Sequence, residues 1–177
     1  MAWSEIAVSL YIRGVPRYDA RLMLRADAKI LDLHRIRPEA ALLQGGVPTA
    51  SMSRLQACLV SLPDVVEVDL RWWGQGAVVR AAGRLRMQTR LPCQRCLTDM
   101  PLLLEAVVDV GFAASESLVE DMDSGLDAVV VEHGRLQLPD WVEDELLLVM
   151  PISPMCQQWR SGVCPVSGVA PYSAVED

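Results

Sequence analysis

Alternating side chains between residues 65 and 91 constrain the fold of this chain more than any other feature. Val65 to Leu70 alternates apolar and charged residues, and a longer stretch from about Ala77 to Leu91 continues the pattern. A period of two is typical of a β-strand with one buried face. The residues from Trp72 to Gly76 lie between the two stretches and predict the turn of a hairpin.

The second stretch gathers arginines on one side. Its even positions include Arg80, Arg84, Arg86 and Arg90, which we call the arginine face. Its odd positions carry Val79, Ala81, Leu85, Met87 and Leu91. Because successive side chains of a strand point to opposite faces, four guanidinium groups should lie on one face and the apolar set on the other. Such a face is a candidate for phosphate contacts.

The segments before this hairpin predict helices. The pattern from Leu31 to Leu43 indicates a short helix with Asp32 as a possible N-cap. Ser51 to Leu62 indicates a second short helix, with Cys58 as a small buried thiol on its apolar face.

The segments after the hairpin predict one further strand pair and one helix. Pro101 to Phe112 is expected to pair with the arginine-bearing strand, and Ala128 to Glu132 forms a short strand. Residues 113–127 are small and acidic and indicate a mobile loop. Leu138 to Val149 predicts an amphipathic helix, with a proline in its first turn and Pro151 after its end.

Together these segments predict an α+β fold. It consists of a small antiparallel sheet around residues 65–112 and 128–138, two short N-terminal helices and one amphipathic helix packed on the sheet. A chain of 177 residues fits one domain. No apolar run approaches the length of a membrane span, and the first ten residues make a poor signal peptide. A cytoplasmic protein without a membrane partner is expected.

The cysteines suggest a metal site. Cys93 and Cys96 form a CxxC between two predicted strands, which resembles a zinc knuckle more than the helix N-terminus of a redox thiol. Cys156 and Cys164 could complete a tetrahedral zinc site. Two alternatives remain: four unmetallated thiols, and a thiol oxidoreductase centred on Cys93.

Charge is divided unevenly along the chain. The net charge is −7, yet residues 1–98 hold 14 Arg and Lys against 8 Asp and Glu, and the remainder holds 2 against 15. Overall acidity argues against non-specific RNA coating, so RNA contact would be local, on the arginine face together with Arg95. Glu143, Asp144 and Glu145 form either a solvated helix face or an acidic patch for a basic protein or for the arginine face.

The sequence proposes no catalytic centre. It contains no GxSxG, no P-loop and no GxGxxG, and its two histidines, His34 and His133, belong to no catalytic motif.

Two motifs resemble a known family. They are LPCQRCL at residues 91–97 and WVEDELLLVMPISP at residues 141–154, with a cysteine following. This pair is similar to the YceD family, bacterial factors with plastid relatives that are implicated in accumulation of 23S ribosomal RNA. The resemblance covers residues 31–168, leaving residues 1–30 as an extension and residues 169–177 as a tail.

The resemblance implies a ribosome biogenesis factor without enzymatic activity, which supports synthesis, processing or stability of the RNA. Many relatives carry four cysteines after the Leu-Pro-x-x-Pro segment, and that pattern falls here on Cys156, Arg160, Cys164 and Ser167. The expected partner is large-subunit ribosomal RNA or a precursor particle. The alternative is an acidic adaptor that binds a basic ribosomal or regulatory protein without touching RNA.

Overall fold

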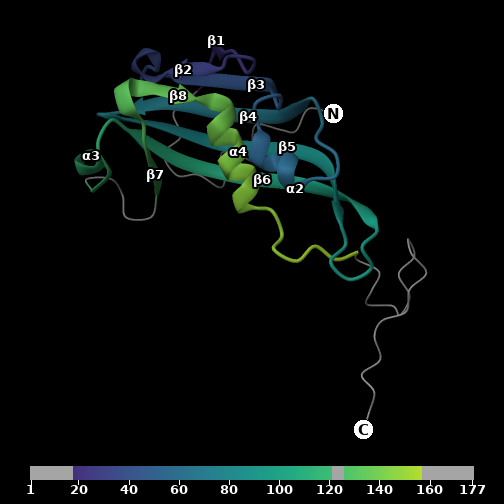
Figure 1. The fold of residues 1–177 in the computed structure, drawn as a ribbon. Coiled ribbons are helices and arrows are strands. Elements are labelled where there is room, and N and C mark those ends of the chain that lie inside the picture. Colours follow the sequence, from purple (N-terminus) through teal and green to yellow (C-terminus); the bar gives the residue numbers. More distant parts are fainter. Residues whose placement is uncertain (1–17, 121–125, 157–177) are drawn as a thin grey trace.

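The computed structural model describes residues 18–120 and 126–156. Figure 1 shows a long twisted sheet crossed on one side by a single longer helix. The elements are β1 Tyr18–Leu24, β2 Ile30–Asp32, the 3-10 turn η1 Leu33–Arg35, β3 Ala40–Pro48, α2 Ser53–Cys58, β4 Val65–Gln75, β5 Val78–Pro92, β6 Asp99–Ala113, α3 Glu116–Glu120, β7 Asp127–Val130, the 3-10 turn η2 Glu132–Gly134, β8 Arg135–Gln137 and α4 Leu138–Leu148. The predicted α+β class is confirmed.

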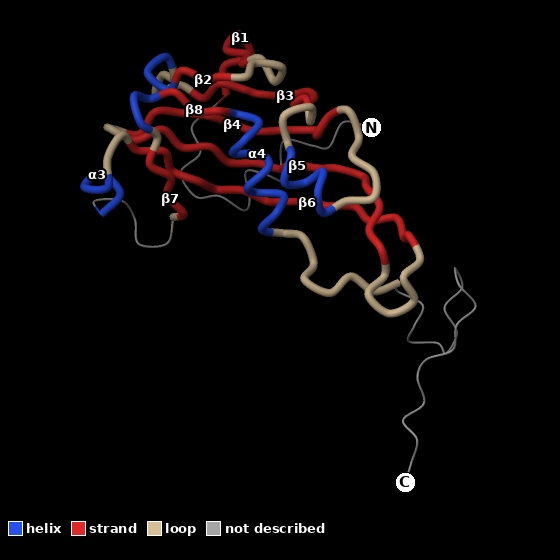
Figure 2. The backbone as a smooth tube through the Cα atoms, viewed as in Figure 1, coloured by secondary structure: helices blue, strands red, loops and turns tan. Residues whose placement is uncertain are grey.

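Six strands form the main sheet in the order β1-β3-β4-β5-β6-β7, and β2 pairs with β8 in a separate small sheet. The central pairs are antiparallel, whereas β1 lies parallel to β3 and β7 lies parallel to β6. The hairpin of β5 and β6 is the longest unit, with 15 residues in each strand. Figure 2 shows this hairpin extending past the other strands at one end.

The core lies between α4 and the sheet. α4 buries Leu138, Trp141, Val142 and Leu146. Trp141 meets Trp72 of β4 and Phe112 of β6 edge-on, with ring centroids 5.5 and 5.3 Å away. Trp72 and Phe112 stack at 5.2 Å. Three aromatic rings therefore fix the helix to the sheet. We call the opposite side of the sheet the outer face.

The helix predicted over residues 31–43 is wrong. The segment forms β2, η1 and β3, and Ala40 to Leu43 are all at most 9% exposed. β3 lies between β1 and β4 and is buried on both faces, so it lacks the alternation that identifies a half-buried strand. A short apolar run of this kind cannot be told from a buried helix by its periodicity.

Other boundaries also differ. The second predicted helix is present but spans only Ser53–Cys58, and Cys58 is exposed rather than buried. β4 continues through the tryptophans to Gln75, and the turn falls at Gly76, whose φ is +64°. The expected loop at 113–127 contains the short helix α3, and residues 121–125 lie outside the described residues. No described helix is long and apolar enough to cross a membrane.

Candidate functional site

Three of the four predicted metal ligands meet at the far end of the β5–β6 hairpin. Cys93 and Cys96 lie in the turn between the strands, and Cys156 lies in the segment that follows α4. That segment runs from the end of α4 back to the hairpin (Figure 2). The three Sγ atoms lie within 4.8 Å of one another, and we call them the cysteine cluster. Cys164, the fourth predicted ligand, lies outside the described residues.

Backbone hydrogen bonds hold the cysteine cluster in place. The Cys93 N–H donates to the Thr98 carbonyl over 3.0 Å, and the Leu97 N–H donates to the Cys93 carbonyl over 2.9 Å. Leu97 adopts a left-handed conformation, with φ of 58°, which closes the turn. The Gln94 N–H donates to the Pro154 carbonyl over 2.8 Å and so ties the segment after α4 to the turn.

The sulfur geometry suits a metal. Cys93 and Cys156 are 0% and 8% exposed, and their Sγ atoms lie 3.8 Å apart, without a disulfide. Two thiolates bound to one tetrahedral zinc at about 2.3 Å are separated by about 3.8 Å. The residues present therefore fit a thiolate-bound metal ion.

The surroundings of Cys93 favour the thiolate that a metal requires. Burial raises the pKa of the Cys93 thiol, but the backbone N–H groups of Cys96, Cys156 and Arg95 together lower it by more. The pKa of this thiol therefore lies below its ordinary value. One of these contacts is the Cys156 N–H, 3.4 Å from the Cys93 sulfur. Thiolates rather than thiols bind metal, so N–H groups aimed at sulfur prepare the site.

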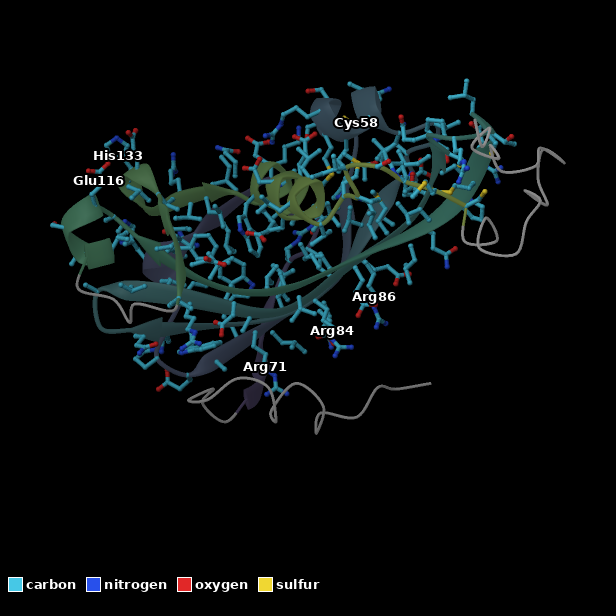
Figure 3. The ribbon with its side chains drawn as sticks, turned by 90° about the horizontal axis from the view of Figure 1, so that it is seen from below. Cys58, Arg71, Arg84, Arg86, Glu116 and His133 are labelled. Atoms are coloured by element: carbon cyan, nitrogen blue, oxygen red, sulfur yellow. The ribbon has the colours of Figure 1, made fainter. Side chains whose placement is uncertain are left out.

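The arginine face lies on the outer face of the sheet. Figure 3 shows Arg84 and Arg86, together with Arg71 of β4, on the side of the sheet opposite α4. Carboxylates of both neighbouring strands share this side, because Arg86 lies opposite Glu67 of β4 and Glu105 of β6. A hollow of about 670 Å³ opens here between β4 and β6 and is lined in part by Arg86, Glu67 and Glu105.

The four arginines differ in how firmly they are held. Arg80 donates two hydrogen bonds of 2.6 Å to Asp109, and its guanidinium lies 5.5 Å from the ring centroid of Trp73. Its side chain is only 14% exposed.

The other three arginines are held more loosely. Arg84 and Arg86 share the single carboxylate of Glu105 at 3.6 and 3.1 Å, and Arg90 donates to the Asp99 carbonyl over 3.1 Å. Arg95 is exposed in the cysteine turn. The partner carboxylates Glu105 and Asp109 were not predicted from the sequence, although the period of two in residues 101–112 puts both on one face.

The three consecutive acids of α4, Glu143 to Glu145, have internal partners. Glu143 is 3% exposed and lies inside the protein rather than in a surface patch. It accepts hydrogen bonds from the backbone N–H groups of Arg54 and Leu55 and from the Arg54 guanidinium. Asp144 also pairs with Arg54, and Glu145 accepts a hydrogen bond of 2.9 Å from the Trp141 indole N–H. Bonds to Asp144 and Glu143 raise the pKa of Arg54.

The fold and site define an α+β protein with a three-cysteine cluster at the end of its longest hairpin and a mixed-charge outer face. The chain belongs to the YceD family: the family described as large ribosomal RNA subunit accumulation protein YceD matches residues 81–175, which is more than half of the sequence. The match begins within β5 and includes the cysteine cluster and α4. Comparison with curated proteins gave no match, and comparison with solved structures gave none.

Proposed function

We propose that this protein is a ribosome biogenesis factor without enzymatic activity, which supports accumulation of 23S ribosomal RNA in the cytoplasm. It would bind large-subunit RNA or an early precursor particle. Membership of the YceD family supports a role in the accumulation of large-subunit ribosomal RNA. The observation that carries the proposed contact is that Arg90 lies just before the turn that holds the cysteine cluster, and the exposed Arg95 lies within that turn.

A zinc ion is part of this proposal. Cys93, Cys96 and Cys156 would bind it, and Cys164 would supply the fourth thiolate. A closed four-thiolate zinc site is structural rather than catalytic, which agrees with a role without enzymatic activity. The chain's own residues would then fasten the segment after α4 to the hairpin and keep Arg95 at a fixed place beside Arg90.

The ion pairs rank the arginines as RNA contacts. Arg80 is nearly buried against Asp109 and Trp73, so its role would be structural. Arg84 and Arg86 both approach the one carboxylate of Glu105, and their side chains are still 32% and 30% exposed. Phosphate would therefore meet Arg84, Arg86, Arg90 and Arg95.

RNA binding at rising salt tests this contact. Replacing Arg84, Arg86, Arg90 and Arg95 by alanine should weaken binding to large-subunit RNA fragments. The slope of the logarithm of the binding constant against the logarithm of salt concentration should become shallower, by an amount that corresponds to the loss of up to about four phosphate contacts. A matched control replaces Arg25 and Arg35, which are 80% and 86% exposed elsewhere on the surface. An unchanged affinity and slope in the fourfold variant would refute the contact.

The second candidate is an adaptor that binds protein only. Carboxylates pair with the arginine face, so the outer face is nearly balanced in charge, and this observation favours a partner other than naked RNA. A basic ribosomal or regulatory protein would then be the ligand. Ultraviolet cross-linking in cell extract separates the two candidates: RNA adducts support the first, and protein adducts without RNA support the second.

A further inference from the structure

Much of one edge of β6 has no partner strand in residues 18–120 and 126–156. β5 pairs with it from Asp99 to Phe112, but β7 pairs only with its last four residues, Val110 to Ala113. Among the described residues, no segment forms backbone hydrogen bonds with the remaining edge of β6. In Figure 3 α4 lies to one side of the sheet and Arg84 and Arg86 to the other. An unpaired strand edge is a template for another strand.

The side chains on this edge do not protect it. Natural edges are blunted by lysine, by proline, by inward-pointing charge or by short length. Pro101 lies at one end of this edge, but residues 102–109 contain neither lysine nor proline, and the inward positions are Leu102, Leu104, Ala106 and Val108. On the outer face Leu103 and Val107 are 53% and 62% exposed, and Glu105 between them is already bound by two arginines.

We propose that β6 pairs with β6 of a second copy of this chain, antiparallel and centred on Glu105. In this register Leu103 of each copy lies opposite Val107 of the other, so both exposed apolar side chains gain an apolar neighbour. A shift by two residues in either direction puts Leu103 or Val107 opposite a carboxylate. Since a register is fixed by such patterns, the sequence of the edge is self-complementary in this one arrangement.

Charge also fits a pair of copies. The two Glu105 carboxylates face each other across the axis, and like charges directly opposite destabilise a sheet. Here Arg84 and Arg86 of each copy lie 3.6 and 3.1 Å from their own Glu105, so each of the facing carboxylates keeps two guanidinium groups beside it. The axis runs perpendicular to the sheet, so the outer faces of both copies join into one continuous surface.

Sedimentation of the full chain over a concentration series, up to about 100 μM, tests this pairing. We expect a reversible dimer, and hydrogen exchange at residues 101–109 that slows as concentration rises. L103K and V107E should each raise the dissociation constant at least about tenfold. I30K is the matched control, because Ile30 is 46% exposed on β2, which belongs to the separate small sheet. It should leave the dimer unchanged.

Mixing the two variants tests the register. An L103K chain paired with a V107E chain places lysine opposite glutamate, so the mixture should regain the dimer that each variant alone has lost. A dimer that persists in L103K and V107E overturns the proposal, as does a mixture that stays monomeric. A wild-type chain that is monomeric throughout also overturns it, and the edge would then be open to a strand of a different protein.

Discussion

Glu143 of α4 accepts a hydrogen bond of 3.0 Å from the backbone N–H of Leu55, at the start of α2. The same carboxylate accepts from the Arg54 N–H over 2.8 Å. A side chain 88 residues away thus serves as the cap of α2, whose own N-cap residue, Met52, has no side-chain oxygen to offer. Such a cap satisfies N–H groups that the first turn of a helix leaves without partners.

Replacing Glu143 should therefore destabilise the protein strongly. We expect E143A to lower the free energy of unfolding by about 2–3 kcal/mol, because buried N–H groups lose a charged acceptor. Urea denaturation followed by circular dichroism measures the loss. D144N is the matched control, since Asp144 is half-exposed, and it should cost far less. Equal losses in the two variants would contradict the capping role.

Metal content should depend on the cysteine cluster. Protein purified without added metal is expected to carry about one zinc ion per chain. C93S, C96S or C156S should abolish it, whereas C58S should not, because Cys58 is an exposed thiol of α2 outside the cluster. Elemental analysis gives the ratio, and C164S tests the fourth ligand. A zinc content near zero in the wild type removes the site and leaves three neighbouring thiols.

Glu145 predicts a pH dependence of stability. Burial raises the pKa of this carboxyl, and the Trp141 N–H lowers it only in part. The folded state therefore holds more protons than the unfolded state between the ordinary pKa and the raised one, so stability falls as pH rises through that interval. E145Q removes this loss and keeps an oxygen for the Trp141 N–H.

We expect E145Q and the wild type to have similar stabilities near pH 3, below the ordinary glutamate pKa. At about pH 7 the variant should be more stable by a few tenths of a kcal/mol, a small figure because water still screens this partly exposed group. Denaturation at both pH values measures the difference. A gain of the same size at both would show that the ionised carboxylate is not its cause.

Ion pairs of the arginine face should differ in strength. A double-mutant cycle on Arg80 and Asp109 should give a coupling energy of about 1–2 kcal/mol, because the pair is bidentate and mostly shielded from water. The Arg86–Glu105 pair is more exposed and should give about 0.5 kcal/mol or less. Similar couplings would remove the basis for ranking these arginines as RNA contacts.

Gly83 should not accept a side chain. It lies in the middle of β5 with φ of +153°, and an added Cβ would lie 2.1 Å from the Asp69 carbonyl oxygen. We expect G83A to lower the free energy of unfolding by about 2–4 kcal/mol. G76A is the comparison, because a Cβ at Gly76 meets nothing within 4 Å, and it should cost only about 1 kcal/mol for its left-handed backbone. Thermal melting of both variants checks the order.

The sequence predicted the parts of the fold that carry their own pattern. The alternation of residues 77–91 predicted the strand β5 and a common face for its arginines. The prolines at 139 and 151 predicted a helix from Leu138 to Val149, which agrees with α4 to within one residue. β3 was missed because its buried run has no period, and β1 because residues 18–24 show none either. Their pairing depends on distant strands, which local pattern does not encode.

The candidate site divides in the same way. The CxxC spacing and the later Cys156 suffice to propose a shared metal site, and the three sulfurs do lie close together. Which carboxylate pairs with which arginine depends on the register between β5 and β6. The sequence alone therefore did not reveal that Glu105 and Asp109 form ion pairs with the arginine face. Nor could it show that Glu143 turns inward, because that depends on where α2 rests against α4.

The cysteine cluster joins positions that the ribosome produces at different times. Cys156 follows Cys93 by 63 residues. At ordinary translation speeds the hairpin turn is therefore synthesised roughly 3–13 s before Cys156, which supplies the third sulfur of the cluster. During that interval Cys93 and Cys96 offer only half of a tetrahedral ligand set. A metal ion bound by all three sulfurs could therefore be captured only after α4 has been made, and in maturation the helix would precede the ion.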